Sequence, residues 1–291
     1  MGADGLRKKA FEYLCERGLP QRGAENWRYT SFKIQEQPDS SSPASGMLLE
    51  TASRGAGPEM RRLDWASDLA EFKGLHQKWN DVFHNFKRKQ RRVMAPPRDL
   101  EIFTDGTDAF HEAFVEELLL VRSKGSLNDL EINFRDVPGA SQGALLFPRI
   151  LIEVQPSHHL TLTTSCLSQQ SSIHSKIQIL LREGARLDWV FLQNSSLNVS
   201  HVEQIEIICE SKAQGHALFV GAGSARSRQN IRLTFADQKA TFKIHGLCLA
   251  NKEQHFDTST VIEHLKGENF SEQLFKSVLG GQAKSIFSGL V

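Results

Sequence analysis

The sequence predicts a mainly β fold with a helical N-terminal region, and two patterns along the chain indicate this class. Before residue 128, apolar residues recur at three- or four-residue steps, which is the period of an amphipathic helix. After about Leu130, short β-branched and alternating runs follow one another between Pro, Ser and Gly residues, as is typical of strands. We therefore divide the chain into a mostly helical region, 1–128, and a β region, 129–291.

The helical region opens with a predicted helix over 6–17, which ends at Gly18 and Pro20. A stretch rich in Ser, Pro and Gly, 39–46, is the predicted linker. The apolar face of the first helix consists of Leu6, Ala10, Tyr13 and Leu14.

Two further helices are predicted before the β region. The longer one runs from about Leu63 to Arg92, and Ala95-Pro96-Pro97 ends it. The shorter one closes near Gly125. Its helical spacing rests on Phe110, Phe114, Leu118 and Val121.

The β region begins with two β-branched runs, Ile150–Val154 and Leu160–Thr164. From Gly184 onward, strand-like segments follow one another with almost no helical pattern. Several of them open with a turn and a small residue, although the spacing between these openings is irregular. This favours the stacked rungs of a solenoid, or a large β-sandwich, over a doubly wound α/β fold. The openings are at 183–185, 214–217, 238–240 and 281–283.

Charge and composition exclude several classes of partner. The chain carries 35 Lys and Arg against 34 Asp and Glu, so we expect no nucleic-acid partner. Its uncharged apolar runs are far shorter than the roughly 20 residues that span a bilayer, so we expect no membrane partner. The first residues do not resemble a secretory signal, and the scattered cysteines form no Cys-x-x-Cys pair, which predicts reduced thiols and a cytoplasmic location. The cysteines are Cys15, Cys166, Cys209 and Cys248.

No catalytic motif stands out, and the chain is predicted not to be an enzyme. It has neither a P-loop nor a G-x-S-x-G elbow, and the β region lacks the closely paired carboxylates of a polysaccharide-cleaving solenoid. The candidate metal ligands are His255 and Asp257, which would share one face of a strand, together with Cys248. A metal-binding β-solenoid module is therefore an alternative function.

Several motifs resemble the SufB/SufD family of scaffold proteins in the SUF system of iron–sulfur cluster assembly. Residues 18–22 (GLPQR) and 25–30 (ENWRYT) are similar to the N-terminal segment of the SufD branch. Residues 254–258 (QHFDT) and 283–289 (AKSIFSG), with His264, Ser271 and Lys276 between them, are similar to the core pattern that both branches share. Residues 183–187 (EGARL) resemble a further rung of that core.

The resemblance implies a right-handed parallel β-helix of the SufBD core type behind a helical N-terminal region. It implies a non-enzymatic scaffold that pairs with a SufB-like subunit, while a SufC-like ATPase supplies the nucleotide chemistry. No cofactor is then bound stably, and an iron–sulfur cluster contacts the chain only transiently in the complex.

Family members continue beyond the rung at 287–289 into a region that holds the SufC docking surface. The printed sequence stops at Val291, which makes a SufC-like ATPase a doubtful partner and leaves the β-helix incomplete at its C-terminus. A shortened form that has lost cluster-assembly activity is the other alternative. An unfinished β-helix exposes a terminal rung, so a homodimer is a further expected association.

Overall fold

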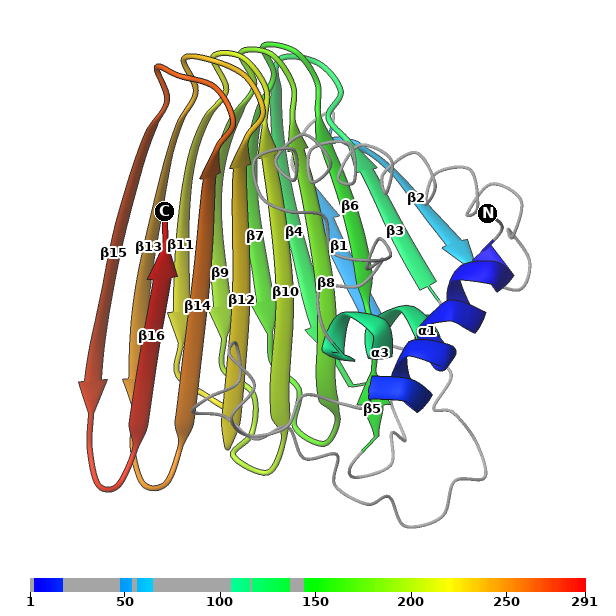
Figure 1. Cartoon of the computed structure of the whole chain (residues 1–291), viewed down its shortest axis with the longest axis vertical. Coiled ribbons are helices and arrows are strands. Elements are labelled where there is room, and N and C mark those ends of the chain that lie inside the picture. Colours follow the sequence, from blue (N-terminus) through cyan, green and yellow to red (C-terminus); the bar gives the residue numbers. More distant parts are fainter. Residues whose placement is uncertain (1–2, 18–47, 54–56, 65–105, 116, 137–143) are drawn as a thin grey trace. The chain divides into compact units, whose positions relative to one another are not determined.

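The computed structural model describes residues 3–17, 48–53, 57–64, 106–115, 117–136 and 144–291 (Figure 1). Contacts divide it into two units. One contains the helices α1 (Ala3–Arg17) and α3 (Gly106–Phe114), and the other contains strand β1 and Leu120–Val291. No helix in the described part is both long and apolar enough to cross a membrane.

The two helices pack on each other through small side chains. Ala10 of α1 and Ala109 and Ala113 of α3 are buried together. The rings of Phe11 and Phe114 meet edge to face, with centroids 5.5 Å apart. Helix α1 confirms the prediction for 6–17.

The third predicted helix is wrong in its second half. Helix α3 ends at Phe114, and Leu118 and Val121 lie on strand β3 (Glu117–Arg122). Leu118–Val121 are four consecutive buried apolar residues. A short strand of this kind cannot be told from a buried helix by periodicity alone.

Other predictions for the first half of the chain lie mostly outside the described residues. These are the motif at 18–30, the linker at 39–46 and the helix at 63–92, of which the structure describes only 63–64, as the end of a strand. The predicted boundary at 128 stays a prediction. The sequence analysis missed the strands before it, β1 (Leu48–Ser53) and β2 (Glu59–Asp64).

The strands form two sheets. The first sheet has the order β1-β4-β7-β9-β11-β13-β15, and the second has the order β16-β14-β12-β10-β8-β6-β3-β2, with the short β5 (Leu145–Leu146) beside β8. The remaining strands of the first sheet are β4 (Leu127–Arg135), β7 (His159–Cys166), β9 (Arg186–Gln193), β11 (Gln214–Gly221), β13 (Thr241–Ala250) and β15 (Phe270–Leu279). Those of the second sheet are β6 (Arg149–Val154), β8 (Ser172–Leu181), β10 (Ser200–Cys209), β12 (Arg226–Phe235), β14 (His255–His264) and β16 (Lys284–Leu290).

From β6 onward the chain alternates between the sheets, and from β7 onward each strand pairs in parallel with the strand one turn earlier. Register partners such as Arg186, Gln214, Thr241 and Phe270 are 27 to 29 positions apart. Within the described residues, the pairs from β4/β6 to β15/β16 make six turns (Figure 1). This confirms the predicted parallel β-helix and decides between the solenoid and the sandwich.

The turns have a regular corner that the sequence analysis did not recognise. A residue with positive φ lies in each connection that leads from a strand of the second sheet to the next strand of the first sheet. Small residues follow three of these corners and are fully buried: Ala185, Ala213 and Ala240. The four strand openings noted in the sequence seemed irregularly spaced because two of them lie elsewhere. Residues 281–283 lie in a connection from the first sheet to the second, and residues 214–217 lie inside β11. The positive-φ residues are Ser157, Gly184, Lys212, Lys239 and Glu268.

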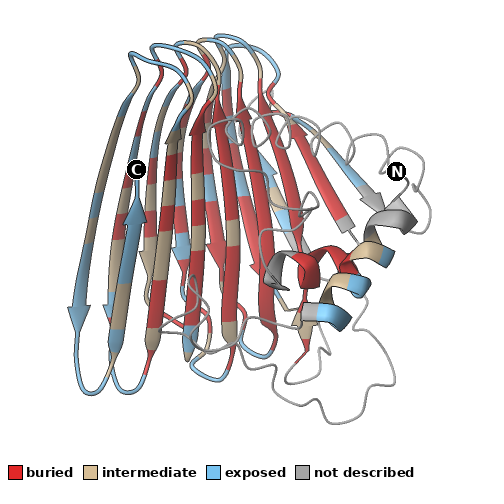
Figure 2. Cartoon of the chain, in the orientation of Figure 1, coloured by how far each residue is buried: buried red, intermediate tan, exposed pale blue. Residues whose placement is uncertain are grey.

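The core lies between the two sheets. In β9, the buried Leu187, Trp189 and Phe191 alternate with more exposed neighbours, as a sheet with one inner face requires. Every residue of β6 and β8 is buried, whereas β15 and β16 are largely exposed (Figure 2).

Candidate functional site

The register of the paired strands determines which side chains lie next to each other in this fold. Neighbouring strands are about 4.8 Å apart, so register partners form rows that cross the turns. Trp189 and its partner Ala217 lie in an inner row, whereas Asp188 and its partner His216 lie in an outer row. Groups almost thirty residues apart in the sequence therefore become neighbours.

The structure places two of the predicted metal ligands on one side of β14. Phe256, between His255 and Asp257, packs inward against Gly221, so the two flanking side chains share one face of the strand, as predicted, and this is the outer face. Asp257 pairs with the guanidinium of Arg228 on the adjacent strand. Burial lowers the pKa of His255; Asp257 opposes this effect, and the charges of Arg226, Lys284 and Arg228 add to it.

The third predicted ligand, Cys248, does not join this pair. It lies in the inner row of the first sheet and hydrogen-bonds with Ser277 and Ser285. Burial raises the pKa of its thiol. Within the described ranges, no three or more His, Cys, Asp or Glu side chains gather as metal ligands. The metal role of these residues stays a prediction.

A polar cluster that the sequence analysis missed lies inside the solenoid. His201 and Glu203, both almost fully buried on β10, face each other with His201 Nε2 3.2 Å from Glu203 Oε1. Gln229, on the next strand, donates from Nε2 to Glu203 Oε2 over 2.8 Å. The His201 ring stacks on Phe191 at a centroid distance of 6.2 Å.

Burial sets the protonation states in this cluster. It lowers the pKa of His201 to about 3 and raises the pKa of Glu203 to about 8, although the hydrogen bond from Gln229 opposes the second change. Near pH 7 the imidazole is neutral and most of the Glu203 carboxyl groups are protonated. The contact is therefore one between neutral groups rather than an ion pair.

Two of the cysteines are buried in the same interior. Cys166 lies 3.4 Å from the Ser195 hydroxyl, and burial raises the pKa of its thiol to about 12. Burial also raises the pKa of Cys209, which is completely enclosed. Because the thiolate is the nucleophile and the metal ligand, neither thiol suits either role in this state.

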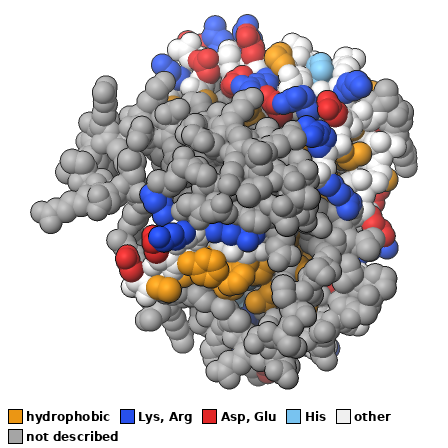
Figure 3. Space-filling view, turned by 90° about the vertical axis from the view of Figure 1, so that its right-hand side faces the viewer, with side chains coloured by type: hydrophobic (Ala, Val, Ile, Leu, Met, Phe, Trp, Pro, Cys, Tyr) orange, Lys and Arg blue, Asp and Glu red, His pale blue; other side chains and the backbone are white. Residues whose placement is uncertain are grey.

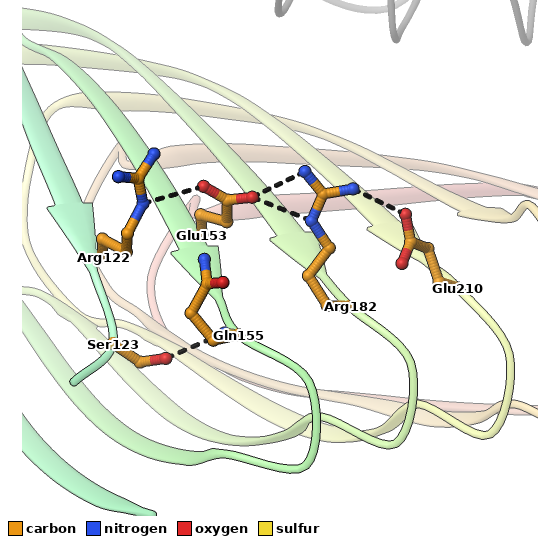
Figure 4. Close-up of polar contacts among 6 residues, drawn as sticks. All are labelled: Arg122, Ser123, Glu153, Gln155, Arg182 and Glu210. Carbon is orange, nitrogen blue, oxygen red and sulfur yellow. Dashed lines mark hydrogen bonds and ion pairs between the residues drawn. The ribbon is translucent and has the colours of Figure 1, made fainter. Parts of the chain in front are cut away.

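Ion pairs cross the turns on the outer side of the second sheet (Figure 4). Glu153 Oε1 accepts from Arg182 Nε and Nη2 at 2.8 and 2.6 Å, and Glu153 Oε2 accepts from Arg122 Nε at 3.1 Å. Arg182 continues to Glu210 through Nη1 at 2.8 Å. These side chains connect four successive strands of the second sheet, β3, β6, β8 and β10, along the solenoid axis.

On the face drawn in Figure 3, the described residues present both basic and acidic side chains, and several basic side chains border a hydrophobic patch. Chemically, the described arrangement positions and encloses polar groups. It does not present an activated nucleophile beside a base.

Comparison with known proteins supplies the family. Residues 137–291, more than half of the chain, match the model described as SUF system FeS cluster assembly, SufBD core domain. The chain is also similar to the iron–sulfur cluster assembly protein SufD of Escherichia coli (strain K12). The two are 21% identical over 296 residues, which cover 97% of this chain and 67% of that protein. Since the matched residues include the strands β5 to β16 of the parallel β-helix, the chain belongs to the SufBD core-domain family of the SUF system.

Proposed function

We propose that this chain is a scaffold subunit in SUF iron–sulfur cluster assembly that acts by contact with a SufB-type subunit and not by catalysis. The observation that carries the proposal is the family match over an in-register parallel β-helix. Such a solenoid holds its side chains in fixed rows and offers long, regular surfaces to other chains. The similarity to SufD over almost the whole chain favours the SufD role within this family.

The surface proposed for the SufB-type partner is formed by strands β15 and β16, which carry exposed apolar side chains. Strands β15 and β16 stand last in the order of the two sheets. The rings of Phe275 and Phe287 stack there with centroids 4.5 Å apart, and Phe287 is 48% exposed. A partner chain that packs on β15 and β16 would cover these rings.

The remaining roles follow from the same proposal. A SufC-like ATPase supplies the nucleotide hydrolysis, since the sequence contains no P-loop. Iron and sulfide, as cargo, contact the chain only while the complex assembles a cluster. We place the complex in the cytoplasm, and we expect the chain to form homodimers where the SufB-type subunit is lacking.

The test is co-purification of the chain with its SufB- and SufC-type counterparts, read by size exclusion with mass determination. We expect the SufB-type subunit to be recovered in a defined complex. The variant Phe287→Lys places a charge on the proposed contact and should lose this partner. Leu249→Lys is the matched control, because Leu249 is 41% exposed on the previous turn of the first sheet.

Recovery of neither counterpart by a folded chain would contradict the scaffold role. Equal recovery with Phe287→Lys and with the parent chain would retain the scaffold role and contradict the proposed contact surface.

A further inference from the structure

We propose that His216 and His245 form a surface site for one borderline divalent transition-metal ion of the Zn²⁺ class, with Glu272 as the group that orients His245. The site lies on the outer face of the first sheet and involves three adjacent strands, β11, β13 and β15. It is distinct from the metal candidates His255, Asp257 and Cys248.

The two histidines present nitrogen atoms to each other. His216 Nε2 lies 3.1 Å from His245 Nδ1, and the rings meet edge to face with centroids 4.8 Å apart. Metal–nitrogen bonds of about 2.05 Å to both atoms would subtend an angle of about 98° at the ion, between octahedral and tetrahedral values. The nitrogens are therefore spaced for one ion to bridge them with little movement.

Glu272 decides which nitrogen of His245 is available. Its Oε1 lies 3.0 Å from His245 Nε2, so the ring donates its proton there and keeps a lone pair on Nδ1, which faces His216. Metal-binding histidines commonly have such a carboxylate behind the ring, where it fixes the tautomer and raises the basicity of the ligand nitrogen. His216 donates to Nδ1 when no ion is bound, and an ion takes the place of that proton.

The surrounding charges are compatible with a cation. Lys243 stands between His216 and Glu272 in the outer row, and its Nζ contacts Glu272 Oε2 at 3.2 Å. This pair is neutral in sum and also holds the carboxylate in place. Asp188, the register partner of His216 on the other side, is negatively charged and pairs with Arg186, whose Nη2 lies 3.0 Å from Asp188 Oδ2.

The site is accessible and incomplete by itself. His216 is exposed, and the side chain of His245 is 26% exposed, so water can fill the other coordination positions. Two protein ligands suit a labile ion rather than a permanent structural one, since structural zinc sites have four protein ligands. A partner chain on this face could supply further ligands.

The experiment is a calorimetric titration of the untagged chain with Zn²⁺, in a Cys15→Ser background because Cys15 is an exposed thiol. Absorption of bound Co²⁺ gives an independent readout of the ligand type. The variants are His216→Gln, His245→Gln and Glu272→Gln. His159→Gln is the control, because His159 lies on the same sheet and pairs with Asp188 at 2.8 Å.

We expect one ion per chain in the tightest class of sites. Either histidine variant should weaken that binding at least tenfold, and His159→Gln should leave it unchanged. Glu272→Gln should weaken it about 10- to 100-fold, which is the usual effect of removing an orienting carboxylate. Saturable binding that survives both histidine variants, or no saturable binding by the folded parent chain, would overturn the proposal.

Discussion

At the scale of single residues, Glu203 links the stability of the protein to pH. Its folded pKa of about 8 lies above the ordinary 4.5, so the native state holds a proton that the unfolded chain releases. This stabilising effect is complete below about pH 4.5 and is lost as the pH rises toward 8. The variant Glu203→Gln lacks this titrating group. The unfolding free energy of the variant minus that of the parent should therefore rise with pH, by up to about 1.4 kcal/mol per pH unit between about pH 5 and 8.

Chemical denaturation at several pH values measures this difference. The control is Glu183→Gln, because the Glu183 side chain is 63% exposed. His201 has the opposite sign, since its lowered pKa costs stability as the pH falls from 6.5 toward 3. A difference between Glu203→Gln and the parent that is constant with pH would contradict the buried neutral carboxyl group.

The backbone of Gly215 lies very close to a buried aromatic ring. An added Cβ would lie 2.1 Å from the Phe242 ring, and Phe242 is fully buried in the neighbouring turn. Gly215→Ala should therefore lower the unfolding free energy by about 1–3 kcal/mol, although alanine is the better strand residue in open space. Gly267→Ala is the control, since nothing lies within 4 Å of its added Cβ. Equal effects on thermal unfolding would show that the ring gives way without cost.

At the scale of elements, the ion pairs around Glu153 connect successive turns. Burial acts to raise the pKa of Glu153, but the hydrogen bonds and charges of Arg182 and Arg122 outweigh it and lower the pKa. Stability from these contacts is therefore present above about pH 4.5 and is lost as the pH falls through the folded value.

Glu153→Gln should cost about 1–3 kcal/mol at pH 7, since it leaves two guanidinium groups without their shared carboxylate. The cost should shrink in acid, and denaturation at pH 7 and below 4 measures it. Removing the exposed Lys212–Glu183 pair, with its 3.5 Å contact, should cost under about 1 kcal/mol. The prediction fails if the loss at Glu153 is as small as that of the exposed pair.

At the scale of the whole molecule, the solenoid should be unevenly stable along its axis. Each turn contacts only its neighbours, so stability depends on how well each turn is covered on both sides. Strands β8 and β10 are almost entirely buried, whereas β15 and β16 are largely exposed. Amide hydrogen exchange should be slowest in the central strands and fastest in β15 and β16. Uniform exchange rates would indicate that the whole solenoid opens as one unit.

The sequence by itself determined the fold class and the alternation within each strand. Apolar and polar residues alternate in β9 with the period of two that one buried face requires, and the family motifs specified a solenoid. It was misleading at Leu118–Val121, since four consecutive apolar residues fit a buried strand and a buried helix equally well. The regular corners were hidden because non-glycine residues occupy most of their positive-φ positions.

Only the tertiary structure decided which polar groups meet. His201 and Glu203 are two residues apart, but nothing in that spacing shows that they face a closed interior rather than solvent. His216, His245 and Glu272 are each separated by 27 or more residues, and they converge because one turn of the solenoid has almost that length. Contacts between strands depend on register, which is a property of the assembled sheet and not of any local segment.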